Sequence, residues 1–137
     1  MKFAKIPSIM VAVMWFVHIA KWLFNAEINR MGVYPRTLNG SAGILLSPLI
    51  HGDLLHLLAN SVPMILLGTA LYYGYEKIAN KVFVLIYLLT GMLVWLLARE
   101  AYHIGASGIV YGLFGFVFSG GMLSKDRSLA VIGLAAF

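Results

Sequence analysis

Cysteine is absent from the 137-residue sequence, and charged residues make up only 11% of it. Without cysteine the chain can form no disulfide, no thiolate nucleophile and no cysteine-ligated metal site. A soluble domain carries about 25% charged residues, so the few charges present cannot cover a water-facing surface. Because 61% of the residues are hydrophobic, the composition predicts a polytopic membrane protein.

Acidic residues are also scarce, with five against ten lysines and arginines, which gives a net charge of +5. The basic residues lie in short segments between apolar stretches and form no cluster, so no nucleic-acid partner is predicted. Acidic residues are missing from the centres of the apolar stretches. This absence argues against a transporter or channel component, in which charged side chains commonly line the path.

The apolar residues are organised in long stretches. A membrane-spanning helix needs about 20 mostly apolar residues. Four stretches approach this length, and a fifth stretch of about ten residues reaches the last residue of the sequence. The five stretches cover residues 6–24, 54–75, 81–98, 105–123 and 128–137. We therefore expect an all-α membrane protein in one domain, residues 1–137, with four complete transmembrane helices and the start of a fifth. Turn-forming residues within positions 25–43 predict a long first loop.

Loop charges predict the orientation of the helices. If the helices alternate, one side carries six basic residues and the other carries three; the six are Lys2, Lys5, Lys77, Lys81, Lys125 and Arg127. Excess positive charge marks the cytoplasmic side, so we expect a cytoplasmic N-terminus. The first loop and the start of the fourth helix then face outward.

Polar residues gather where the second apolar helix begins. His56 and Asn60 are four residues apart and share one helix face, while Asp53 suits the N-cap position. The pair fits interhelical hydrogen bonding or a wet cavity. His51, Asp53 and His56 are possible metal ligands, but the two histidines lack the four-residue spacing of a helical metal pair. No metal or cofactor is predicted.

Small residues mark the start of the fourth helix, where Gly105 and Gly108 flank Ser107. Glycines at this spacing, continued by Gly112 and Gly115, allow helices to approach closely. A serine at a helix N-terminus also has free backbone N–H groups beside its hydroxyl, and these can hold an oxyanion. Both interpretations remain open from these residues alone. For the outlying His18 and His103, we expect packing or boundary roles.

The two polar segments together resemble the rhomboid family of intramembrane serine proteases. The resemblance is carried by a His-x4-His-x3-Asn motif, followed two helices later by Gly-x-Ser-Gly and a tyrosine; the matching residues are His51, His56, Asn60, Gly105, Ser107, Gly108 and Tyr111. The first loop and its approach to the second helix are also similar to those of many bacterial members.

The resemblance implies a six-helix core with a Ser–His dyad that lies below the membrane surface and is reached by water from outside. Ser107 would be the nucleophile, and His56 and Asn60 would stabilise the oxyanion. Tyr111 would pack against the general base, with His51, Gly105 and Gly108 in supporting positions. The substrates would be transmembrane segments of other proteins, the membrane would be the bacterial inner membrane, and no cofactor would be needed.

One departure from the family pattern concerns the general base. The family uses a histidine in an Ala-His-x-x-Gly motif on its sixth helix, and this sequence contains no such motif. A second departure is Ile104, where some members have glycine. We therefore expect little or no proteolysis from the 137 residues alone and a protease from the complete protein. The alternative is a non-catalytic rhomboid-like protein that binds transmembrane segments.

Overall fold

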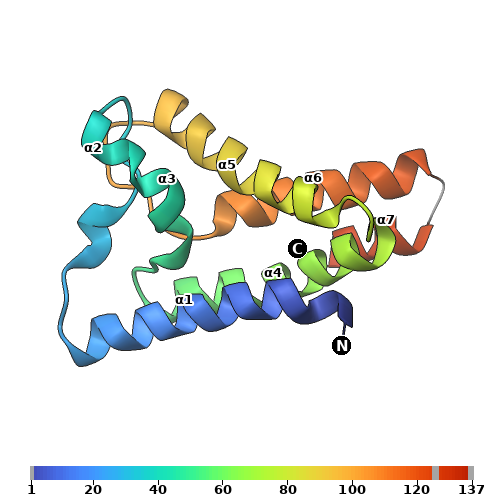
Figure 1. Cartoon of the computed structure of the whole chain (residues 1–137), viewed down its shortest axis with the longest axis horizontal. Coiled ribbons are helices and arrows are strands. Elements are labelled where there is room, and N and C mark those ends of the chain that lie inside the picture. The colour runs from blue at the N-terminus through green and yellow to red at the C-terminus, as the bar shows by residue number, and fades with distance from the viewer. Residues whose placement is uncertain (1, 125–126, 136–137) are drawn as a thin grey trace.

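The computed structural model describes residues 2–124 and 127–135, and helices dominate them (Figure 1). The longer helices match the predicted apolar stretches within two residues at each described end; they are α1 (Lys5–Leu23), α4 (Leu54–Gly74), α5 (Ala79–Leu97), α6 (Ser107–Leu123) and α7 (Arg127–Ala135). A 3₁₀ turn, η1 (Lys2–Ala4), precedes α1. The last two residues of the fifth predicted stretch lie outside the described residues. The predicted all-α membrane fold is confirmed.

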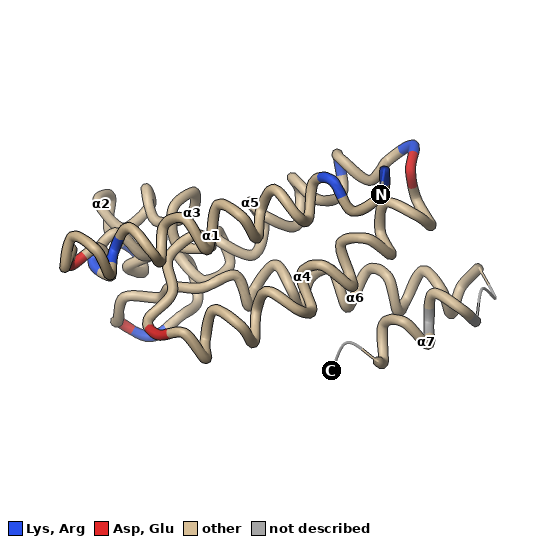
Figure 2. The backbone as a smooth tube through the Cα atoms, turned by 90° about the horizontal axis from the view of Figure 1, so that it is seen from below, with Lys and Arg blue, Asp and Glu red and all other residues tan. Residues whose placement is uncertain are grey.

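Helix length and charge placement fit a lipid bilayer. Three helical segments are long and apolar enough to cross a membrane, namely Lys2–Leu23, Leu54–Gly74 and Ala79–Leu97. The fourth predicted span, α6, is an apolar helix of 17 residues and so about 26 Å long, somewhat short of the ~30 Å hydrocarbon core. Charged residues gather at the two ends of the long helices (Figure 2). The chain is an integral membrane protein.

Helix α4 lies at the centre of the bundle, with α1 packed on one side and α6 on another. Its buried leucines and methionine form the core with side chains from α1 and α6; fully buried are Met14, Leu57, Met64, Leu67, Leu71, Ile109, Leu113 and Val117. Gly68 lets the N-terminal part of α1 approach, because an added Cβ would lie 2.5 Å from Pro7 Cγ. Further along, Trp15 Nε1 donates to Ser61 Oγ at 3.1 Å.

The glycines of α6 divide between packing and open space. A Cβ on Gly112 would lie 2.5 Å from Ile86 Cγ2, so this glycine lets α6 approach α5 as the sequence suggested. A Cβ on Gly108 would lie 3.3 Å from Thr90 Cβ of α5. Among the described residues, no atom of another element lies within 4 Å of a Cβ position on Gly115, so the predicted close approach is absent at this glycine within that part of the chain.

The predicted first loop is a chain of short helical turns rather than an irregular segment. It contains η2 (Ile28–Met31), α2 (Leu38–Ser41), α3 (Gly43–Leu46) and η3 (Ser47–Leu49), and α2 and α3 lie beside α5 (Figure 1). Trp95 Nε1 donates to the Thr37 carbonyl at 2.9 Å. The Arg36 guanidinium donates to the Ala98 carbonyl at 2.9 Å, which places a positive charge at the negative end of the α5 dipole.

Candidate functional site

The segment that leads into α6 is held by the first loop. Val33 and His103 exchange backbone hydrogen bonds of 2.9 and 2.8 Å, and the Gly105 N–H donates to the Ser47 carbonyl at 2.8 Å. Gly32 permits this contact, since a Cβ there would lie 2.5 Å from the His103 carbonyl oxygen. Three backbone bonds to distant residues therefore fix the entry into α6.

Ser107 is the first residue of α6, as the sequence predicted, and it is exposed. Ala106 precedes it at the N-cap position and supplies no side-chain cap. The first N–H groups of a helix have no partner within the helix, and their dipoles create a partial positive charge there. The serine hydroxyl thus stands beside backbone donors that can stabilise a developing negative charge.

His56 and Asn60 occupy the first turns of α4. Asp53 is the N-cap residue, and its Oδ1 accepts the His56 N–H at 2.8 Å, which confirms the predicted cap. Asn60 is buried, and its Nδ2 donates to the His56 carbonyl at 2.8 Å. An amide nitrogen carries two hydrogens, so one N–H of Asn60 remains for another acceptor.

The His56 ring lies directly against Gly105. A Cβ on Gly105 would be 2.5 Å from His56 Nε2 and 2.7 Å from Cε1. Gly105 also has a φ of +102°, a conformation that side chains other than hydrogen disfavour. Two separate features therefore require glycine at position 105: the positive φ of the backbone and the close approach of the His56 ring.

The predicted residues of α4 and α6 meet at one cavity of about 340 Å³; it is lined by His56, Ala59, Asn60, Pro63, Ser107, Val110 and Tyr111. A smaller cavity of about 120 Å³ lies on the α5 side of Ser107; it is lined by Gly108 together with Ser107, Gly105 and His103. The geometry therefore brings Ser107, His56, Asn60 and Tyr111 together and places Gly108 behind the serine.

His51 supports the cavity from behind. Its side chain is only 1% exposed, and its ring meets the His56 ring edge-to-face at 5.0 Å between centroids. Burial, followed by the neighbouring His56, lowers the pKa of His51 from 6.5 to about 4. At neutral pH His51 is therefore an uncharged ring packed against His56.

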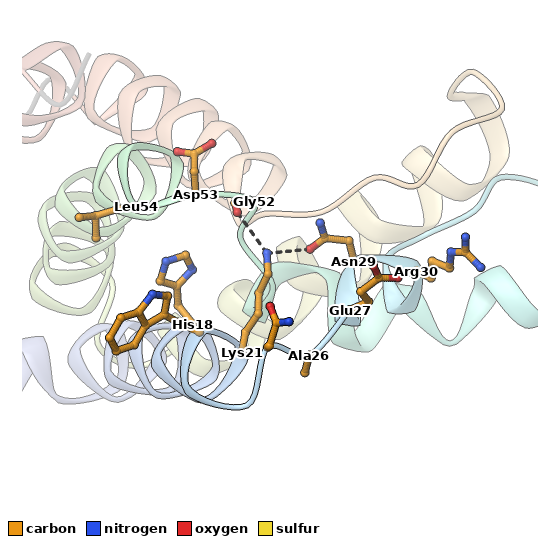
Figure 3. Close-up of a pocket in the computed structure, with 11 residues that line it drawn as sticks. His18, Lys21, Ala26, Glu27, Asn29, Arg30, Gly52, Asp53 and Leu54 are labelled. Atoms are coloured by element: carbon orange, nitrogen blue, oxygen red, sulfur yellow. Dashed lines mark hydrogen bonds between the residues drawn. The ribbon is translucent and has the colours of Figure 1, made fainter.

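The two remaining histidines lie apart from that cavity. His103 Nε2 is 2.9 Å from the Arg99 carbonyl oxygen, so its ring is engaged at the bundle boundary as predicted. His18 lines a larger polar cavity of about 680 Å³ between α1, the first loop and the start of α4 (Figure 3). Among residues 2–124 and 127–135, no group of three His, Asp or Glu side chains is arranged to bind a metal ion.

The sequence reasoning missed Lys21, which lines the same polar cavity. Its Nζ donates to the carbonyls of His51 and Gly52, each at 3.1 Å. A lysine in the last turn of an apolar helix is usually a boundary residue whose ammonium reaches toward water. Only the long-range fold shows that this ammonium faces the turn before α4.

Comparison with known proteins gives consistent matches. The family model described as "Rhomboid domain" matches residues 39–136. An uncharacterised protein of Mycobacterium tuberculosis (strain ATCC 25618 / H37Rv) is 28% identical over 130 residues, which cover 90% of this chain and 54% of the relative. The candidate rhomboid protease YdcA of Bacillus subtilis (strain 168) is 32% identical over 111 residues, covering 72% of this chain and 54% of the relative.

The chain thus spans about half the length of the curated relatives it matches, with 54% and 51% covered in the mycobacterial proteins. The second of these, from Mycobacterium leprae (strain TN), is also uncharacterised and is 23% identical over 129 residues. No solved structure matches the chain significantly.

Proposed function

The chain belongs to the rhomboid family, and from this premise we propose that its site cleaves peptide bonds within the membrane, with Ser107 as the nucleophile. The observation that carries the proposal is the cavity shared by Ser107, His56 and Asn60 at the start of two apolar helices. A packing role for Ser107 would not explain the polar side chains that line the same cavity.

The proposed reaction begins with attack of Ser107 Oγ on the scissile carbonyl carbon. The carbonyl oxygen then becomes an oxyanion, and the proposed donors that stabilise it are the Ser107 backbone N–H, the second N–H of Asn60 Nδ2 and an N–H of the His56 ring. Removal of one such donor typically lowers kcat about 10²- to 10³-fold. Gly105 lets the His56 ring lie against the turn before the serine, because no side chain projects from that turn.

A general base must take the Ser107 proton for this attack to occur. His103 lines the smaller cavity with Ser107, but its Nε2 is engaged with the Arg99 carbonyl oxygen. His51 lies behind the His56 ring. His56 is already assigned to the oxyanion. The proposal therefore requires a further histidine as the general base, as the family resemblance implies.

The proposed substrates are transmembrane segments of other proteins. The cavity lies between two apolar helices, α4 and α6, which fits a substrate that is itself stable in lipid. A cytoplasmic N-terminus, inferred from the loop charges, would place the start of α6 toward the outer face of a bacterial inner membrane. Tyr111 lines the same cavity as Ser107.

The test is cleavage of a transmembrane reporter by the natural full reading frame in bacterial membranes. We expect Ser107→Ala to abolish cleavage, with a loss of at least about 10³-fold. Ser124→Ala, which removes a hydroxyl just beyond the other end of α6, should leave cleavage unchanged. Unaltered cleavage by Ser107→Ala would refute the proposal. Absence of cleavage in every version would favour a protein that binds transmembrane segments without cutting them.

A further inference from the structure

Lys21 uses its whole hydrogen-bonding capacity at one place. An ammonium group has three N–H donors and no acceptor, and Lys21 Nζ has three oxygen partners. These are Asn29 Oδ1 at 3.0 Å and the carbonyls of His51 and Gly52 at 3.1 Å each. Figure 3 shows the side chain extending from α1 across the polar cavity toward the turn that precedes α4. The ammonium thus ties α1 and the first loop to that turn.

The turn held by Lys21 lies next to His56. The His51 ring packs edge-to-face on the His56 ring, and a Cβ at Gly52 would lie 4.0 Å from His56 Nδ1. Asp53 Oδ1 accepts the His56 N–H. His51 thus contacts the His56 ring and Asp53 holds its backbone, so we infer that a displacement of the turn moves the imidazole.

The opposite side of the His56 ring has little freedom. Nε2 and Cε1 lie against the Cα of Gly105, with no room for even one additional carbon atom. The ring is thus confined between the turn at residues 51–53 and the loop that delivers Ser107. Packed groups yield little, so a displacement of the turn at residues 51–53 is expected to shift the His56 ring toward the loop that precedes Ser107.

We propose that Lys21 is a positioning residue, whose ammonium fixes the turn at residues 51–53 and thereby sets the His56 ring against Gly105 beside Ser107. This inference rests on the proposed function, since an oriented His56 matters for catalysis only if Ser107 reacts. The bonds to the two carbonyls are charge-assisted and about twice as strong as neutral ones. Without Lys21, both carbonyls and Asn29 Oδ1 lose this donor, and the turn is free to reorient.

Lys21→Met is the informative variant, because methionine keeps the length and apolar stem of lysine while removing all three donors. Arg30→Met is the matched control: Arg30 lines the same cavity on another side of it, and its loss removes one positive charge from that cavity (Figure 3). Lys21→Arg keeps a charged donor. All three are made in the natural full reading frame.

The first measurement is NMR of the labelled His56 imidazole in detergent micelles, assigned through a His56→Gln variant. We expect Lys21→Met to shift the His56 ring resonances and Arg30→Met to leave them in place. Unshifted resonances in Lys21→Met, or equal shifts in both variants, overturn the inference. This readout needs no catalysis, so it stands even if Ser107→Ala shows that the proposed protease function is wrong.

The second measurement separates kcat from KM in the reporter assay. A misplaced catalytic group can lower the rate about 100-fold. We therefore expect kcat of Lys21→Met to fall about 10- to 100-fold, with KM changed less than about threefold. Lys21→Arg should retain the larger part of the wild-type kcat. A general structural role would instead lower the unfolding temperature and the active fraction together. An unchanged kcat, or equal losses in Lys21→Met and Lys21→Arg, would overturn the inference.

Discussion

Gly105→Ala tests the closest contact of the candidate site. Two separate penalties arise, because Gly105 has a φ of +102° and its added Cβ would lie 2.5 Å from His56 Nε2. The backbone strain costs about 1–3 kcal/mol. Relief of the overlap requires the ring or the loop to move by about 1 Å, since ordinary contacts between heavy atoms are about 3.5 Å. Such a displacement near the reacting atoms lowers the rate about 100-fold.

Gly115→Ala is the matched control for that substitution. It adds the same methyl group to α6, where no described atom of another element lies within 4 Å of the new Cβ. Alanine in a helix is favoured over glycine by about 1 kcal/mol. Thermal unfolding in detergent should therefore show a lower midpoint for Gly105→Ala and an equal or higher one for Gly115→Ala. The same two proteins are compared in the reporter assay. Wild-type stability and cleavage in Gly105→Ala would refute the contact as described.

Two further predictions concern the start of α4. The unfolded chain protonates His51 near pH 6.5 but the folded chain only near pH 4, so the unfolded state binds more protons between these values and stability falls as the pH is lowered through this window. The free energy of unfolding should fall by about 3 kcal/mol in total, at about 1.4 kcal/mol per tenfold difference in proton affinity. Unfolding midpoints measured from pH 7 to 4 should show this fall. His51→Gln should remove the part of the pH dependence that comes from this histidine. Asp53→Ala should cost about 1 kcal/mol through loss of the N-cap, with Asp53→Asn close to wild type in the same unfolding assay; equal losses in both variants would exclude capping as the cause.

The long helices could be predicted because their cause is local. A run of about 20 apolar residues specifies a membrane helix wherever it occurs, and charged or turn-forming residues mark its ends. The short helices of the first loop follow from distant contacts instead. Arg36 and Thr37 are bonded to residues at the end of α5, and a four-residue helix such as α2 has too few internal hydrogen bonds to form alone.

The candidate site could be predicted in part for the same reason. The spacing of His56 and Asn60 places both on one helix face, and the serine among glycines suits a helix start. The contact between His56 and Gly105 joins residues that are distant in the sequence, and the bonds of Lys21 to His51 and Gly52 join different helices. Such contacts depend on how α1, α4 and the first loop pack, which no local pattern contains.

The central claim is that Ser107 is a reactive nucleophile, and covalent labelling tests it most directly. The natural full-length protein is treated with a fluorophosphonate, which a reactive serine oxygen attacks with loss of fluoride, and the adduct is located by mass spectrometry. We predict phosphonylation of Ser107 and none in Ser107→Ala, with slower labelling in Asn60→Ala because an oxyanion donor is lost. A folded protein that remains unlabelled at Ser107, or labels equally at Ser124, would contradict the account.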